Sequence, residues 1–498
     1  MVTLLTQPII DSLTPGERLP RLPVPAQIVS NGEFTPPAQT VNQRLYQSLM
    51  QESIARNSSQ QDRAATAWAK TPCAMASAFG IMNTVYSPHF SVTEGEQHDQ
   101  AEAVSRQDRL SAQFVFDDQV HFLRDDADPA YFEPLTGLIE LSAELLQLPH
   151  ARTFDIEHIK FAHFLKAIFL DSDTKVALLS GAPSEGVPML TNDQMAQARA
   201  AVNSVAGERR LLTHAVLGPG HDGWLDEMDR VHAELKPDGW KGYCVGEPFS
   251  PSEKRYRLDD EALMYPAYER IAAAGVRNVC IHKGLLPENA DEVMPGAEPF
   301  AKVDDVGKVA QDWPHLNFVI YHAAYRTIPQ PTEAELHRFE ATGRIDWVSD
   351  LAAIPAQYGV DNVYADIGAS FAFTVLTHPR LAAAMVGMLI KGLGADHVLW
   401  GTDSVWYGSP QWQIEAFRRL IMPPDLVERF GYADLGGDDS PIRRAILGEN
   451  GARLYNVNTA DYCANGLKET HLERIVKDYR AAGGTPDHAV HGYAAGGD

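Results

Sequence analysis

Short apolar runs alternate with helix-spaced apolar residues along most of the chain from residue 112 onward. Eight of these runs have the length and composition of buried strands. They are residues 112–116, which lead into 117–121, and then 175–180, 211–217, 239–245, 278–282, 317–322, 362–367 and 397–403. The pattern therefore predicts eight strands.

Helical segments separate most of these strands. They cover residues 192–205, 259–274, 304–313 and 381–391, and the second has Asp259 or Asp260 as its N-cap. Eight strands that alternate with helices predict an α/β fold, a closed (β/α)8 TIM barrel of parallel strands. The rival is an open doubly wound sheet, which would need a Gly-rich phosphate-binding turn after its first strand. The sequence has no such turn.

Two flanking regions differ in pattern from the barrel. Residues 1–110 begin with a stretch rich in Pro, Thr and Gln and continue into a polar helix at 41–69. Residues 458–498 contain a charged helix at 467–482 and a Gly-rich end. We therefore expect an N-terminal arm and helical extension (1–110), a catalytic barrel (111–457) and a C-terminal helix with a flexible tail (458–498). The extension is expected to cover the bottom of the barrel or to contact a second subunit.

Composition narrows the class of function. The 498 residues include 42 Lys and Arg against 66 Asp and Glu, so the formal net charge is −24. Such a chain repels phosphates, so we expect no nucleic-acid partner and no anionic membrane surface. No apolar stretch is long enough to span a bilayer, and no signal peptide is evident. With four cysteines and no C-x-x-C pair, we expect a cytoplasmic protein in which Cys244 and Cys280 are buried thiols.

Polar residues with metal-binding chemistry stand at the ends of four predicted strands. The first strand ends in Gln119-x-His121, the fifth in His282, the sixth in His322 and the eighth in Asp403. In a barrel, the C-terminal ends of the strands meet at one rim, and residues two apart on a strand face the same side. Neutral imidazoles and a carboxylate suit a divalent ion, which would activate a water molecule near neutral pH.

These segments also resemble a known family. FDDQVH at the first strand, VCIHKG at the fifth, LNFVIYHAAY at the sixth and VLWGTDSVW at the eighth are similar to the amidohydrolase-2 branch of the amidohydrolase superfamily, as is the closing segment IRRAILGENGARLYNV. That branch includes aminocarboxymuconate-semialdehyde decarboxylase and related aromatic-acid decarboxylases. The resemblance covers about residues 112–457, roughly two-thirds of the chain.

The resemblance implies a role for each rim residue. His121 would be the second histidine of the family's H-x-H pair and a metal ligand, and His282 would be the ligand from the fifth strand. His322 would contact the water or the substrate, and Asp403 would bind the metal and move a proton. The chain departs from the family at Gln119, which stands where the first histidine is usual. An amide oxygen is a harder and weaker donor than imidazole, so the change favours Mn²⁺ over Zn²⁺, reduces the number of protein ligands, or marks a site that has lost its metal. We expect one divalent ion, Zn²⁺ or Mn²⁺, held by Gln119, His121, His282 and Asp403.

Three further residues are candidates for binding substrate. Lys283 and Arg326 stand just past the fifth and sixth strands and would bind a carboxylate, and Trp406 would form part of an aromatic pocket wall. Surface ion pairs and ordinary packing are the alternatives for them. The acidic loop 284–300 is placed where a lid would lie.

Three functions fit this arrangement. The first is a metal-dependent hydrolase that acts on a small organic substrate, aromatic or carboxylated, with His322 and Asp403 as the catalytic residues. The second is a metal-dependent, non-oxidative decarboxylase of an aromatic or unsaturated acid. The third is a barrel that binds a ligand without catalysis. In each case the partners expected are a small molecule and a second copy of the chain, in a homodimer or higher homo-oligomer.

Overall fold

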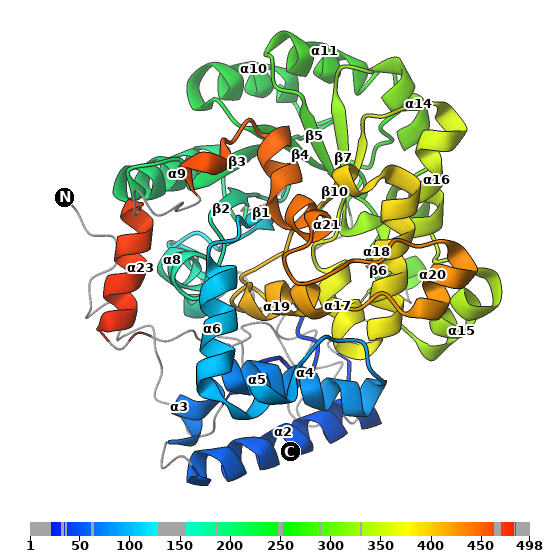
Figure 1. Ribbon diagram of the computed structural model, residues 1–498. Helices are drawn as coiled ribbons and strands as arrows, with labels where there is room; N and C mark the ends of the chain where they lie inside the picture. The colour runs from blue at the N-terminus through cyan, green and yellow to red at the C-terminus, as the bar shows by residue number, and fades with distance from the viewer. Residues whose placement is uncertain are drawn as a thin grey trace.

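Eight parallel strands form the centre of the protein in the computed structural model (Figure 1). The structure describes residues 21–30, 34, 37–60, 64–127, 156–184, 188–247, 252–287, 290–328, 331–462, 470–482 and 484. The strands, in their order around the sheet, are β1 (Phe116–Val120), β2 (Val176–Leu179), β3 (Leu211–Val216), β4 (Gly239–Tyr243), β5 (Asn278–His282), β7 (Asn317–Tyr321), β9 (Val363–Asp366) and β10 (Val398–Leu399). Each run predicted from the sequence contains one of them.

The barrel is closed by backbone hydrogen bonds between β1 and the segment that follows β10. Asp118 N donates to Trp400 O (2.8 Å), Asp403 N donates to Gln119 O (2.9 Å), and His121 N donates to Ser404 O (2.6 Å). Two of the predicted rim residues, Gln119 and Asp403, are therefore joined directly through the main chain, and His121 is joined to the residue after Asp403. The predicted TIM-barrel fold is confirmed.

Helices cover the outside of the barrel and extend it at both ends of the chain. The barrel helices are α8 (Phe161–Leu165), α9 (Asn192–Ala206), α10 (Trp224–Leu235), α11 (Tyr265–Ala273), α12 (Ala290–Val293), α13 (Glu298–Ala301), α14 (Val306–Asp312), α15 (Glu333–Thr342), α16 (Val348–Tyr358), α17 (Ser370–Thr377), α18 (Pro379–Leu393), α19 (Gln411–Arg419), α20 (Pro424–Phe430), α21 (Pro441–Arg444) and α22 (Asn450–Leu454). The N-terminal extension contributes α2 (Val41–Gln60), α3 (Ala65–Ala69), α4 (Pro72–Tyr86), α5 (Glu94–His98) and α6 (Gln100–Ser111), and α23 (His471–Ala481) lies near the C-terminus.

Several predicted helices differ in extent from those observed. The helix expected at 259–274 begins only at Tyr265, because residues before it form turns. The polar helix expected at 41–69 is two helices, α2 and α3. The closing segment contains one π-helical turn, Ala445–Glu449, between α21 and α22. The loop 284–300 holds a two-residue strand, β6 (Leu286–Pro287), which pairs with β8 (Thr327–Ile328). The arm before residue 21 and the tail from 485 lie outside the described residues.

The N-terminal extension packs on the helices that follow β9 and β10, not only on its own residues. The Phe34 ring contacts Phe373 of α17 at a centroid distance of 5.8 Å, and Phe373 contacts Tyr407 at 5.3 Å. Since Tyr407 lies four residues after Asp403, this contact joins the extension to the rim that bears the candidate site. These contacts therefore lie on the side of the barrel that bears the candidate site, and not at the bottom, where the extension was expected.

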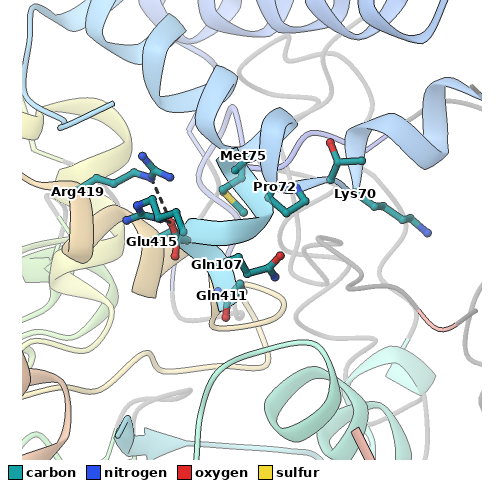
Figure 2. Close-up of a pocket in the computed structure, with 10 residues that line it drawn as sticks. Lys70, Pro72, Met75, Gln107, Gln411, Glu415 and Arg419 are labelled. Carbon is teal, nitrogen blue, oxygen red and sulfur yellow. Dashed lines mark hydrogen bonds and ion pairs between the residues drawn. The ribbon is translucent and has the colours of Figure 1, made fainter. Parts of the chain in front are cut away.

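A buried ion network holds the extension to α19. Glu415 binds Arg106 of α6 (2.7 Å), and Arg419 binds Glu96 of α5 (2.7 Å). Figure 2 shows Gln411, Glu415 and Arg419 of α19 beside Gln107 and Met75 of the extension, around a cavity of about 40 Å³. Because these charges satisfy one another away from water, the extension and the barrel form one packed unit.

One simpler expectation is also met. Cys244 and Cys280 are buried and carry free thiols. Among the helices in the described ranges, none combines the length and the apolar character required to cross a lipid bilayer.

Candidate functional site at the barrel rim

Five candidate residues from separate strand ends lie in the barrel. Gln119 is on β1 and His121 follows it, His282 ends β5, His322 follows β7, and Asp403 lies four residues beyond β10. Each of the five residues is at least 94% buried. Strand ends thus supply these groups as the sequence predicts, and the structure divides them into two sets.

The first set is a triangle of three polar side-chain atoms. His121 Nε2 lies 3.1 Å from Asp403 Oδ1, and Gln119 Nε2 lies 3.1 Å from the same oxygen and 3.3 Å from His121 Nε2. His121 Nδ1 donates to the carbonyl of Ser180 (2.7 Å). In a neutral imidazole that bond leaves the lone pair on Nε2, which faces the triangle.

The second set is a pair of histidines. His322 Nδ1 donates to the carbonyl of Gly368 (2.9 Å), and His322 Nε2 lies 3.0 Å from His282 Nδ1. Because a carbonyl oxygen only accepts, the proton of neutral His322 is on Nδ1, and its Nε2 accepts a hydrogen bond from His282 Nδ1–H. The unprotonated nitrogen of His282 is then Nε2, whose lone pair is not used within the histidine pair. Burial together with the charge of Lys241 lowers the pKa of His282 to about 3, and burial and His282 lower that of His322. Both imidazoles are neutral at physiological pH.

The backbone at the rim adopts a conformation that L-residues rarely take. His322, Ala323 and Ala324 have φ values of 62°, 50° and 52°, and Asp403 has φ of 57°. Left-handed backbone at non-glycine residues persists only where the surrounding structure holds it, and it concentrates at functional sites. The turn after β7 places the His322 ring beside His282.

A second layer of charged groups lies beneath the rim. Asp118, Asp366 and Lys241 come from β1, β9 and β4, and all three are completely buried. Lys241 Nζ lies 3.3 Å from the centroid of the Tyr321 ring. Burial raises the pKa of Asp366 to about 7 and lowers that of Lys241 to about 8. Asp118 and Lys241 lie inside their strands, and Asp366 is the last residue of β9. None of the three was predicted from the sequence as a site residue, although a charged residue within an apolar strand run is itself a signal.

The triangle fits a divalent ion when Gln119 supplies its oxygen. Ligand atoms that share one ion at bond lengths of about 2.0–2.2 Å lie about 3 Å apart, like the three atoms of the triangle. In the described orientation the amide nitrogen faces His121 and Asp403, and Gln119 Oε1 is buried without a donor among the described residues. A half-turn of the amide exchanges the two atoms, places Oε1 in the triangle and leaves three lone pairs that converge, which a cation satisfies.

In the part of the chain that the structure describes, the common metal-binding side chains His, Cys, Asp and Glu do not form a metal site by themselves. Within the described ranges, no group of three or more His, Cys, Asp and Glu side chains lies in position to hold a metal ion. Gln119 is therefore required as the third donor beside His121 and Asp403. His282 belongs to the histidine pair and is not brought into the triangle.

The three predicted substrate-binding residues have different surroundings. Lys283 is completely buried, and its ammonium donates to both oxygens of Asp305 (2.9 and 2.8 Å) and to Phe300 O (2.9 Å), which uses all three of its N–H groups. It is therefore not brought to the rim cluster. Arg326 is half-buried and stacks on Trp347 at 5.7 Å. Trp406 is buried three residues after Asp403.

Comparison with known proteins gives one family match. Residues 168–457 match the model of a protein family described as Amidohydrolase. No curated protein sequence matches the chain.

Solved structures give matches at low sequence identity. An uncharacterized TIM-barrel protein from Bordetella bronchiseptica is 14% identical, with a TM-score of 0.43, over 69% of this chain and 98% of that one. 5-Carboxyvanillate decarboxylase from Sphingomonas paucimobilis is 14% identical, with a TM-score of 0.38, over 70% of this chain and 100% of that one. A protein titled putative 2-pyrone-4,6-dicarboxylic acid hydrolase, from Pseudomonas putida, is 16% identical, with a TM-score of 0.39, over 70% of this chain and 98% of that one.

Proposed function

The chain belongs to the amidohydrolase family, whose members are generally metal-dependent enzymes, and we propose that it hydrolyses a small organic substrate with the help of one divalent ion. The observation that carries this proposal is the triangle of Gln119, His121 and Asp403, with separations of 3.1–3.3 Å. Gln119 Oε1, His121 Nε2 and Asp403 Oδ1 would hold the ion. When bound, such an ion polarises a substrate carbonyl and lowers the pKa of water.

The protein side chains then have distinct roles. Asp403 accepts a proton from the attacking water and returns it to the leaving group, because it is the carboxylate of the triangle. His121 is held in one tautomer by the Ser180 carbonyl, which keeps Nε2 directed at Asp403. His322, held by the Gly368 carbonyl, keeps His282 in the tautomer that leaves Nε2 unprotonated.

The identity of the ion follows from the donor set. One imidazole, one carboxylate and one amide oxygen form a set with more oxygen than nitrogen, which favours Mn²⁺ over Zn²⁺ relative to sites with two histidines.

The substrate is a small aromatic or carboxylated molecule, and the assembly is a homodimer or higher homo-oligomer.

A second candidate is non-oxidative decarboxylation of an aromatic or unsaturated acid. Arg326 favours it, because this half-buried residue forms no ion pair with any described residue and is positioned just past β7. A substrate carboxylate would form an ion pair with the Arg326 guanidinium. The same rim residues would then deliver a proton to carbon instead of removing one from water.

One substrate screen separates the two reactions. Protein loaded with Mn²⁺ or Zn²⁺ is incubated with small esters, lactones and amides and, separately, with hydroxybenzoic acids, while acid release and carbon dioxide release are recorded. If the protein is a hydrolase, only the esters, lactones or amides should be turned over, and Asp403→Asn should abolish that turnover. The control Glu227→Gln, which changes an exposed ion pair far from the rim residues in sequence, should retain it. Carbon dioxide release that depends on Arg326 would instead establish the decarboxylase.

A further inference from the structure

The Gln119 amide has two ends with different surroundings. One end faces His121 Nε2 and Asp403 Oδ1 in the triangle. The other lies against Gly368, which the Asp366 carboxylate also approaches, since a Cβ built on Gly368 would be 2.5 Å from Gln119 Oε1 and 2.9 Å from Asp366 Oδ1. The neighbours of both ends include a carboxylate. Only one of the two ends carries N–H groups, so the amide can donate to one carboxylate at a time.

The Asp366 carboxylate is placed to compete for those N–H groups. Its Oδ1 accepts from Gly368 N (2.9 Å), and its Oδ2 is buried without a hydrogen-bond partner among the described residues. Two glycines leave room for it, because a Cβ on Gly401 would lie 2.1 Å from Asp366 Oδ2 and 3.1 Å from Gln119 Cβ. The Asp366 carboxylate and the Gln119 side chain therefore approach the same two glycines, at positions where a Cβ would collide with them.

The two amide orientations have different consequences. With the nitrogen in the triangle, Gln119 Oε1 stays buried beside Asp366 without a donor, a cost of about 1–3 kcal/mol for such an atom. With the nitrogen toward Asp366, the carboxylate gains a donor and Oε1 joins His121 and Asp403. A cation in the triangle would balance the converging lone pairs and would also favour the ionised form of Asp366.

We propose that Asp366 is a positioning residue that turns the Gln119 amide so that its carbonyl oxygen, and not its nitrogen, faces His121 and Asp403. Asp366 thereby makes an amide serve where a histidine is usual. The inference rests on the proposed function, because it requires that an ion binds in the triangle. It goes beyond that function by assigning a role to a buried carboxylate of β9 that ligates nothing itself.

The test uses a substitution that removes the choice of orientation. Glu at position 119 has the size of Gln but two equivalent oxygens, so Gln119→Glu presents an oxygen to the triangle whatever Asp366 does. Asp366→Asn is made in the wild-type and the Gln119→Glu chains. The affinity of the full-length, metal-stripped proteins for Mn²⁺ and Zn²⁺ is then measured by competition with a fluorescent chelator. Asp118→Asn, which neutralises another buried carboxylate of the same layer, is the matched control for charge.

The proposal predicts a loss that depends on the residue at 119. Asp366→Asn should lower affinity about 10–100-fold when Gln119 is present, the usual effect of removing a group that orients a ligand. In the Gln119→Glu chain the same change should leave affinity unchanged or raise it, because it removes repulsion between two carboxylates. Asp118→Asn should have the same effect in both chains, because it acts only through charge.

Other outcomes overturn the proposal. Equal losses from Asp366→Asn in both chains would mean that Asp366 acts only through its charge, and no loss in either would mean that it does not act on the site. If the wild-type protein bound neither ion, the proposed function would fail together with this inference, whereas the first two results leave that function intact. Should Asp366→Asn not fold by circular dichroism, Asp366→Ser, which also removes the carboxylate, replaces it in the same two chains, with the same results expected and the same results overturning the proposal.

Discussion

Glu415 is the centre of the ion network that joins the N-terminal extension to the barrel, and its removal is predicted to destabilise the protein. Its carboxylate accepts from Arg106 (2.7 Å), Arg418 (3.1 Å) and Arg419 (3.1 Å), and its side chain is 7% exposed. Although burial alone would raise it, the pKa of Glu415 is held below its ordinary value by the charges of Arg106, Arg419 and Arg418. The change Glu415→Gln keeps the shape and removes the charge.

The expected magnitude follows from what the three arginines retain. Breaking a buried ion pair typically costs about 3–5 kcal/mol because a charge is left without compensation. Here Arg418 keeps Asp173 (2.6 Å), Arg419 keeps Glu96 (2.7 Å) and Arg106 keeps Asp438 (3.2 Å). The loss should therefore lie at the lower end, about 3 kcal/mol, a large part of the roughly 5–15 kcal/mol by which proteins are stable.

Urea unfolding followed by fluorescence measures this loss, and limited proteolysis locates it. We expect Glu415→Gln to unfold at lower urea and to be cleaved first within the extension, residues 41–111. Glu227→Gln, which breaks an exposed pair with Arg230, should cost less than about 1 kcal/mol. If Glu415→Gln cost no more than this control, the buried network would not be what holds the extension to α19.

Further predictions concern buried charges and the pH range of stability. Asp305→Ala should lower the free energy of unfolding in urea by about 3–5 kcal/mol, because it leaves the buried Lys283 ammonium without its carboxylate. The KM of the metal-loaded enzyme should not change, because Lys283 lies outside the rim cluster. A selective rise in KM would show that Lys283 binds substrate. Burial, chiefly, lowers the pKa of His89 to about 4 from 6.5, so the unfolded chain binds a proton more readily and stability is lost as pH falls from about 6.5 toward 4. His89→Gln should flatten this dependence by up to about 1.4 kcal/mol per pH unit, and an unchanged slope would contradict the assignment. Arg326→Gln should raise KM only for substrates that carry a carboxylate, and an equal effect on neutral substrates would argue against that role.

The sequence predicted the barrel because its strands are short, apolar and regularly separated, and because helices with ordinary stop signals lie between them. It did not predict α4, since the helix is apolar on nearly all sides and has no helical period to detect. Its start does carry a signal, Thr71 as N-cap followed by Pro72. The extent of the helix expected at 259–274 was wrong because turns there share the composition of a helix start.

The rim residues were predictable, and the layer beneath them was not. Strand order alone places His121, His282, His322 and Asp403 at one end of the barrel. The division into a triangle and a histidine pair depends on backbone conformations that no spacing rule supplies, such as the left-handed turn at His322. A register shift between Asp117 and Val120 interrupts the alternation of β1, so the position of Asp118 could not be derived from the period of a strand.

The most direct test of the central claim is the metal content of the protein purified without chelators. We expect about one equivalent of Mn²⁺ or Zn²⁺ in the wild-type protein, lost in both His121→Ala and Asp403→Ala and retained in Glu227→Gln. A folded wild-type protein that neither contains nor takes up a divalent ion, or a full equivalent retained in His121→Ala, would contradict it.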